Sequence, residues 1–169
     1  MISICQQDLI VRLQSLAESS DQSVVIGISG YGGSGKSTFA SDLSSQIPDS
    51  VVIGVDQYYV LEKDVVDGNW DCFDRSLMRG EVQRHLGRAK LIICEGVGIF
   101  HPDTVDQFSI RIWVDLDLET ATNRGMKRDR EVQGHNHDHL WREIWEPNER
   151  RFEAKHDPQS KATHFLMGL

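Results

Sequence analysis

The sequence has little cysteine and no long hydrophobic run, and each shortage excludes a class of protein. Its three cysteines, Cys5, Cys72 and Cys94, are too few and too scattered for a disulfide framework or a zinc ribbon, and they suit a reducing compartment. No apolar stretch approaches the ~18 residues that a membrane span needs. The first residues, MISICQQDLI, lack the basic and apolar regions of a signal peptide. We therefore expect a cytoplasmic protein that does not bind a membrane.

Positive charge is also scarce, because 18 Lys and Arg face 26 Asp and Glu, giving a formal net charge of -8. A protein that binds nucleic-acid backbone needs a basic face, so we expect no nucleic-acid partner. Hydrophobic residues make up 39% of the chain and charged residues 26%, which is ordinary globular usage. The 169 residues match the length of one domain, so we expect a single domain over 1–169. The sequence leaves open whether copies of the chain form a homo-oligomer.

Short apolar runs alternate with helical patterns along the chain, which predicts βαβ units and an α/β fold. The run 23–29 is nearly continuous and rich in β-branched residues, as is typical of a strand buried on both faces of a parallel sheet. We expect three layers, with a mostly parallel sheet of about five strands flanked by helices. The predicted strands are 23–29, 51–55, 91–94, 110–114 and 163–167, and the predicted helices are 6–19, 36–47, 76–86, 118–128, 140–146 and 148–156.

The segment Gly-Tyr-Gly-Gly-Ser-Gly-Lys-Ser at 30–37 has the spacing of a phosphate-binding loop, G-x-x-x-x-G-K-[ST]. Glycines allow a tight turn whose backbone N–H groups face one anion, and the helix that follows adds free N–H groups and a favourable dipole. Lys36 would reach the β- and γ-phosphates of ATP, and the Ser37 hydroxyl would ligate Mg²⁺. Kinases, hydrolases and switches share this loop. The predicted nucleotide-binding residues are Gly30, Gly32, Gly33, Ser34, Gly35, Lys36, Ser37 and Thr38.

Three predicted strands end in a carboxylate, at the edge where ligands bind to such sheets. Asp56 follows the second strand and could accept the proton of a substrate hydroxyl. Glu95 follows the third, at the position of a Walker B acid, which holds Mg²⁺ directly or through water. Asp115 follows the fourth, but a predicted helix begins just after it, so a capping role is an equal alternative.

Basic residues gather between Arg124 and Arg130, in a chain that is otherwise acidic. Arg124 and Arg128 are four residues apart and share one helix face, and on a lid they would offset the charge of a transferring phosphoryl group. The alternative is a solvated helix C-terminus, where basic side chains favour the dipole. We place the lid at roughly 124–140. Its second half contains three histidines that either bind a metal or belong to a flexible loop: His135, His137 and His139.

In order along the chain, these motifs resemble those of the uridine kinase and phosphoribulokinase group of P-loop kinases. Residues 30–38 are similar to that group's phosphate loop. Asp56-Gln57-Tyr58-Tyr59 is similar to its Asp-x-Phe-Tyr, whose Asp is the catalytic base. Asn69-Trp70-Asp71 resembles its Asn-Phe-Asp, whose Asp holds the ribose hydroxyls, and Ile93-Cys94-Glu95-Gly96 resembles its apolar-Glu-Gly. Arg124-Gly125-Met126-Lys127-Arg128-Asp129 resembles the lid pattern Arg-Arg-x-x-Arg-Asp.

The resemblance implies a kinase that transfers the γ-phosphate of MgATP to an alcohol group of a nucleoside, uridine-like, or of a similar small neutral metabolite. ATP and Mg²⁺ are the implied cofactors. The implied roles are catalytic for Asp56, Lys36 and Arg128, metal-binding for Ser37 and Glu95, and substrate-binding for Asp56, Tyr59, Asp71 and Arg124.

Departures from the group's pattern keep alternatives open. Gly125 stands in place of the second lid Arg, and Val132-Gln133-Gly134-His135 in place of Glu-Arg-Gly-Arg. Only residues 87–90 span the place where uridine kinases carry a segment that contacts the pyrimidine. The acceptor could therefore be a non-nucleoside alcohol, or the chain could be a regulatory or degenerate nucleotide-binding protein without turnover. A hydrolase or switch ranks last, since the sequence shows no water-positioning residue. Residues 56–75 contain six acidic and two basic residues. This excess of negative charge around the proposed acceptor loop favours a neutral acceptor.

Overall fold

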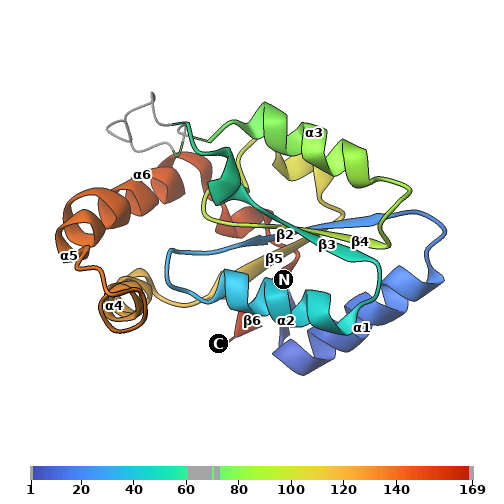
Figure 1. The fold of residues 1–169 in the computed structure, drawn as a ribbon, viewed down its shortest axis with the longest axis horizontal. Helices are drawn as coiled ribbons and strands as arrows, with labels where there is room; N and C mark the ends of the chain where they lie inside the picture. Colours follow the sequence, from blue (N-terminus) through green and yellow to red (C-terminus); the bar gives the residue numbers. More distant parts are fainter. Residues whose placement is uncertain (1, 61–69, 71–72, 168–169) are drawn as a thin grey trace.

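The computed structural model describes residues 2–60, 70 and 73–167. Its strands form one six-stranded sheet in the order β1-β6-β5-β2-β4-β3, and every neighbouring pair is parallel. Helices cover both faces, which confirms the three-layer α/β fold (Figure 1). The strands are β1 (Ile2–Ile4), β2 (Val24–Ser29), β3 (Ser50–Gly54), β4 (Leu91–Glu95), β5 (Ile110–Asp115) and β6 (His164–Met167).

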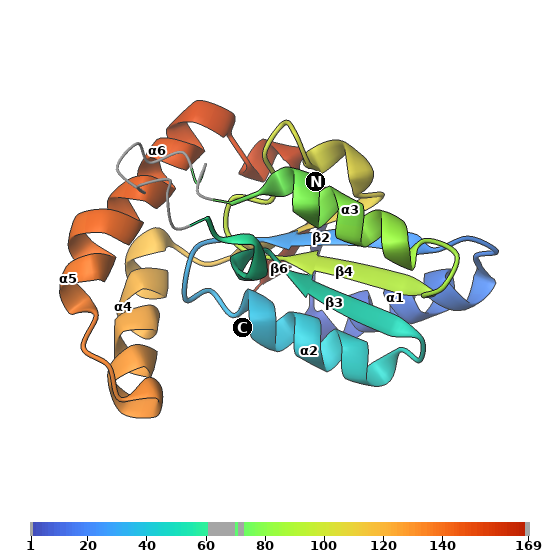
Figure 2. The ribbon, with the colours of Figure 1, turned by 45° about the horizontal axis from the view of Figure 1, so that its top comes forward.

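The helices divide into those that cover the sheet and those that lie at its end. In Figure 2, α1 and α2 lie below the sheet and α3 above it, while α4 and α5 stand together beside the end from which α2 starts. No described helix is long and apolar enough to cross a bilayer. The α-helices are α1 (Gln6–Ser19), α2 (Lys36–Gln46), α3 (Arg75–His85), α4 (Leu118–Arg128), α5 (Asp138–Leu140) and α6 (Glu146–His156). Shorter 3-10 helices span Val55–Tyr58, Val105–Gln107 and Gln159–Lys161, and π-helical turns span Asp129–Gln133 and Trp141–Trp145.

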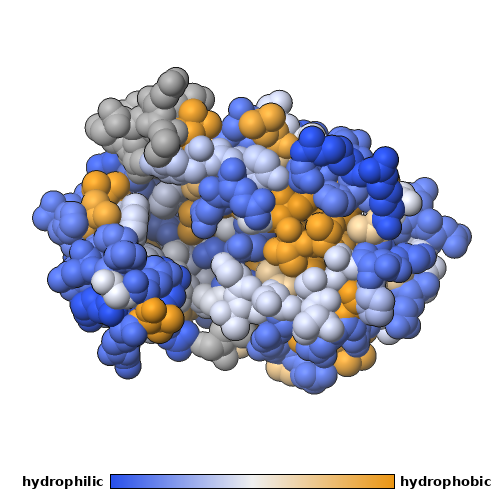
Figure 3. Space-filling model, viewed as in Figure 1, coloured by the Kyte–Doolittle hydropathy of each residue, from blue (hydrophilic) through white to orange (hydrophobic). Residues whose placement is uncertain are grey.

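Strand β2 separates two hydrophobic cores, because successive side chains of a strand point to opposite faces. Ile26 and Ile28 belong to the core beneath α1 and α2, whereas Val25 belongs to the core beneath α3. All six residues of β2 are buried, as the continuous apolar run predicts. The edge strand β3 is less covered: Val52 is 38% exposed, and a hydrophobic patch lies over this part of the sheet (Figure 3).

The prediction of about five strands is wrong by one, and the sheet is parallel throughout rather than mostly so. The missed strand is β1, which has three residues and pairs with β6 from Ile2 opposite His164 to Ile4 opposite Leu166. A segment this short carries no recognisable alternation. It is held as a strand by a partner more than 150 residues away and by burial of the Ile4 side chain.

The predicted break at Pro147 is also wrong. The π-helical turn Trp141–Trp145 continues directly into α6, and Pro147 lies in the first turn of that helix. A proline inside a helical segment removes one backbone N–H donor, and the π-helical turn just before Pro147 is the kind of local irregularity found at such positions. The chain therefore crosses this region as one helical segment.

Candidate active site

The phosphate-binding loop connects β2 to α2, as the sequence predicts. Gly33 and Gly35 have φ angles of +82° and +100°, which side chains rarely adopt. A Cβ atom on Gly33 would also overlap the backbone carbonyl of Ala121 in α4. The loop is thus shaped by its own glycines and by close contact with α4.

Lys36, the first residue of α2, is only 6% exposed. Its ammonium group donates a 2.7 Å hydrogen bond to the carbonyl of Tyr31. Burial lowers the pKa of Lys36, while the carboxylates of Glu149, Glu95 and Asp56 act in the opposite direction. The lysine therefore stands among three carboxylates.

Ser37 and Glu95 meet at the carboxyl ends of the strands. The Ser37 hydroxyl donates a 3.2 Å hydrogen bond to Oε2 of Glu95, the last residue of β4. Burial raises the pKa of Glu95, and the charge on Lys36 and the hydrogen bond from Ser37 oppose that change. The Ser37 hydroxyl oxygen and the Glu95 carboxylate oxygen could both be ligands of one Mg²⁺ ion. Mg²⁺ usually takes one or two protein oxygens and completes its coordination shell with phosphate oxygens and water.

These residues surround one cavity of about 520 Å³, within the size range of small-molecule sites. It brings together most of the predicted site, namely Gly32, Gly33, Gly35, Lys36, Ser37, Thr38, Asp56, Tyr59, Glu95, Arg124 and Arg128. Gly30 and Ser34 do not line it, and the side chain of Ser34 is fully buried. Asp71 lies outside the described residues. Asp115 is not among the lining residues.

Asp56 and Tyr59 come from the 3-10 turn that follows β3, and both line the same cavity as the phosphate loop. Asp56 belongs to the turn, and Tyr59 caps it. Tyr59 forms an isolated antiparallel bridge with Phe73, and their rings meet edge to face at 5.9 Å. The Phe73 ring in turn stacks on Trp70, also at 5.9 Å. Asp56 therefore stands beside a wall of aromatic rings.

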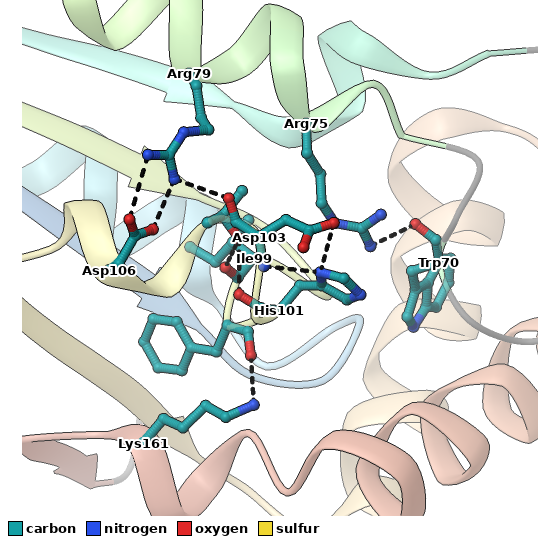
Figure 4. A network of polar contacts seen from close by, with 10 residues as sticks. Trp70, Arg75, Arg79, Ile99, His101, Asp103, Asp106 and Lys161 are labelled. Atoms are coloured by element: carbon teal, nitrogen blue, oxygen red, sulfur yellow. Dashed lines mark hydrogen bonds and ion pairs between the residues drawn. The ribbon is translucent and has the colours of Figure 1, made fainter.

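The aromatic wall is held in place from α3 and from the loop that follows β4. Arg75 donates a 2.8 Å hydrogen bond to the carbonyl of Trp70 (Figure 4). Arg79, one turn further along α3, binds both carboxylate oxygens of Asp106 and the carbonyl of Asp103. These contacts join α3 to the loop after β4 and so fix the position of the wall.

The cluster of basic residues divides between the cavity and the surface. Arg124 and Arg128 on α4 line the cavity, as their spacing predicts. Lys127 instead approaches Glu131, and Arg130 forms an ion pair with Asp138 at 2.5 Å. Two of the four basic side chains are thus placed to meet a ligand.

The histidines at 135, 137 and 139 do not form a metal centre in this structure. His135 stacks on His137 at 5.3 Å, and Nδ1 of His137 lies 3.5 Å from the carboxylate of Asp129. Within the described ranges, no group of three or more His, Cys, Asp or Glu side chains could hold a metal ion.

No protein-family profile matches the chain. It is 28% identical over 162 residues to the uridine kinase of Pectobacterium carotovorum subsp. carotovorum, covering 73% of this chain and 76% of that protein. It is 29% identical over 161 residues to uridine kinase-like protein 3 of Arabidopsis thaliana. That match covers 73% of this chain, which spans about a third (34%) of the Arabidopsis protein.

The chain is similar to uridine kinases. The resemblance read from its motifs is thus confirmed. Solved structures agree in fold. A Bacillus stearothermophilus protein described as a possible uridine kinase superposes with a TM-score of 0.63 at 14% identity, covering 94% of this chain and 99% of that one. Shikimate kinase from Acinetobacter baumannii, solved with shikimate, gives a TM-score of 0.58 at 16% identity, covering 90% and 88%.

The glycine that replaces the second lid arginine of the uridine kinase pattern has a steric reason. A Cβ atom on Gly125 would overlap the indole ring of Trp141. The same ring lies against Gly32 of the phosphate loop, about 3.0 Å from the place of a Cβ there. Trp141 therefore fills the space between α4 and the phosphate loop, and a side chain at position 125 has no room.

Several residues that line the cavity have no role assigned from the sequence, although Trp70 and Gly96 stand within the quoted motifs: Trp70, Phe73, Gly96, Val97, Trp141, Trp145 and Glu149. One signal could have found part of this set. The chain has only four tryptophans, and three of them line the cavity. Tryptophan is a large amphipathic residue suited to ligand and partner contacts, so the pair Trp141 and Trp145 within the predicted helix 140–146 was informative.

Proposed function

We propose that this protein is a small-molecule kinase that transfers the γ-phosphoryl group of MgATP to a hydroxyl of a nucleoside or of a similar small neutral metabolite. One observation carries the proposal. A single cavity brings together the phosphate loop, the Ser37–Glu95 pair, Asp56 and Arg128. These are the parts that phosphoryl transfer requires: a phosphate cradle, metal ligands, a base and a cation.

On the nucleotide side, the backbone N–H groups of the loop and the N-terminus of α2 would bind the phosphates. Lys36 would turn from the Tyr31 carbonyl toward the β- and γ-phosphates. Ser37 and Glu95 would hold Mg²⁺, which when bound neutralises charge on the phosphate oxygens. Arg128 would stabilise the charge that spreads over the transferring phosphoryl group.

On the acceptor side, Asp56 would orient the attacking hydroxyl and accept its proton as the oxygen bonds to phosphorus. The bond between the γ-phosphorus and the bridging oxygen breaks, and ADP leaves. Tyr59 would contact the acceptor, together with Asp71 and Arg124 as the resemblance implies. The aromatic wall of Tyr59, Trp70 and Phe73 supports an acceptor with a flat or apolar face.

We also propose that residues 1–169 act as one domain and that roughly 124–140 serve as its lid. Arg124 and Arg128 would then reach the phosphates from α4, while the segment after it excludes water from the reaction. The placement of both arginines on the cavity side of α4 supports this role.

The proposal is tested by incubating the protein with MgATP and a panel of nucleosides, sugars and other small alcohols, and measuring ADP release. We expect one class of acceptor to stimulate release, and the Asp56→Asn variant to lose that stimulation. Stimulation by a sugar or another non-nucleoside alcohol would identify the acceptor as such. Tight ATP binding with no stimulation across the panel would contradict the kinase proposal and indicate a regulatory nucleotide-binding protein.

A further inference from the structure

Glu149 of α6 is a buried carboxylate that has no part in the mechanism above. Its side chain lines the cavity, and the residue is only 7% exposed. Oε1 accepts a 2.6 Å hydrogen bond from the backbone N–H of Gly32. The contact joins residues 117 positions apart, and it places a carboxyl group directly on the phosphate loop.

A carboxylate at this position resembles the anion that the loop is built to bind. Phosphate oxygens and carboxylate oxygens both accept hydrogen bonds from clustered backbone N–H groups. The N–H of Gly32 lies within the loop that lines the cavity, and Glu149 already uses it. A nucleotide would therefore bring its phosphates to a place where one acceptor and one negative charge are present.

The carboxylates around Lys36 also indicate that Glu149 opposes phosphate binding. Glu149, Glu95 and Asp56 all act on this one lysine. In the proposed mechanism the negative charges of Glu95 and Asp56 are needed, for the metal and for the proton of the hydroxyl. The charge on Glu149 has no such use, and in a buried site it repels the phosphates with little screening by water.

We propose that the Glu149 carboxylate is an internal competitor of the nucleotide's phosphates and sets the affinity of the loop for them. The inference rests on the proposed binding of a nucleotide at the loop. Glu149 belongs to α6, which continues from the Trp141–Trp145 turn. When phosphates displace the Glu149 carboxylate from Gly32, the position of this helical segment is therefore coupled to phosphate binding. Weaker binding of ADP would speed its departure after transfer.

The surroundings of Glu149 favour its neutral form. Burial raises the pKa of Glu149 to about 7, Lys36 and the Gly32 N–H act in the opposite direction, and Glu153 adds to the rise. Tyr31 of the loop also faces it, with its own pKa raised by burial and by Glu153. Near neutral pH the carboxyl group can thus lose its negative charge by taking up a proton.

The test is the affinity for ADP, measured by titration calorimetry at pH 8 on the full chain. Glu149→Gln keeps an oxygen that can accept from Gly32 but removes the charge, so we expect it to bind ADP roughly tenfold more tightly than the wild type, about 1.4 kcal/mol. Glu143→Gln, which removes a charge from an exposed side chain, is the matched control and should leave the affinity unchanged.

Unchanged or weaker binding by Glu149→Gln would overturn the inference, while failure of the wild type to bind ADP at all would instead contradict the proposed function. If Glu149→Gln does not fold, the pH dependence of ADP binding by the wild type tests the inference instead. Between pH 7 and pH 8.5, where ADP is already ionised, affinity should fall several-fold as Glu149 gains its charge. An affinity that stays level or rises over this range would overturn the inference.

Discussion

The indole N–H of Trp141 donates a 2.8 Å hydrogen bond to the carboxylate of Asp129, which lies twelve residues earlier and is almost fully buried. The other oxygen of the same carboxylate accepts two hydrogen bonds from the guanidinium group of Arg128. Burial raises the pKa of Asp129, but the bonds from Trp141 and Arg128 outweigh it, and the net shift is downward. Asp129 therefore joins the ring that covers the phosphate loop to an arginine that lines the cavity.

Replacing Asp129 by Ala should destabilise the protein by about 1–3 kcal/mol, because it leaves the buried N–H of Trp141 without a partner. Urea unfolding monitored by tryptophan fluorescence would measure the loss. Asp21→Ala, at an exposed position, is the control. A variant of Asp129 as stable as the wild type would show that the contact contributes nothing to the fold.

Lys36→Met should reduce turnover by at least roughly a hundredfold, because it removes a positive charge from the developing transition state. Steady-state ADP release with a responsive acceptor would measure it. Lys155→Met, in the exposed last turn of α6, should leave turnover unchanged. Equal activity of the two variants would exclude the assigned role of Lys36.

Asp56→Asn should lower kcat by roughly 10²–10⁴, the usual contribution of a positioned base. The affinity for ADP should change little, because Asp56 lies in the turn after β3 and not in the phosphate loop. Kinetics and calorimetry on the same preparation would separate the two effects. A loss of ADP affinity with an unaltered kcat would argue that Asp56 serves the nucleotide instead.

Gly125→Ala should destabilise the protein by about 1–3 kcal/mol, because the added methyl group would overlap Trp141. Gly80→Ala is a matched control, since Gly80 lies inside α3 with open space around its Cβ position. Gly80→Ala should stabilise the protein by up to about 1 kcal/mol, because alanine has a higher helix propensity than glycine. Thermal unfolding of both variants would measure the contrast, and equal effects would refute the packing argument.

Glu149 should make stability depend on pH in a predictable direction. Its pKa is about 7 in the folded protein, against an unfolded value near 4.5. The folded state therefore binds the proton more tightly, and this contribution to stability is complete below about pH 4.5 and is lost as pH rises through 7. Relative to Glu149→Gln, the wild type should lose on the order of 3 kcal/mol between pH 4.5 and pH 8. Parallel denaturation curves across this range would show whether the difference grows with pH.

Local patterns in the sequence predicted the parts of the site that follow strands. The phosphate loop, Asp56 and Glu95 each come directly after an apolar run, and the sheet brings the ends of those runs together. Strand β1 was missed because three residues carry too little pattern. Its place depends on β6, at the opposite end of the chain.

The contacts that the α5–α6 region makes with the phosphate loop were beyond sequence reasoning for a different reason. Trp141 and Glu149 reach Gly32 only because the chain folds back over the phosphate loop after α4. No spacing within 141–149 reveals that contact. The wrong prediction of a helix break at Pro147 also arose from reading the local sequence alone. A proline marks the start or end of a helix only when the conformation of the neighbouring turns is known.

The contact between Gly125 and Trp141 also limits how this protein can vary. An arginine cannot be placed at position 125 while the indole ring occupies its space, and removing the ring alone would open a void beside the phosphate loop. The two positions are therefore interdependent, so a designer who wishes to restore a second lid arginine must change both together. The glycine at position 125 is therefore explained by the packing of Trp141, and by itself it gives no reason to regard the site as degenerate.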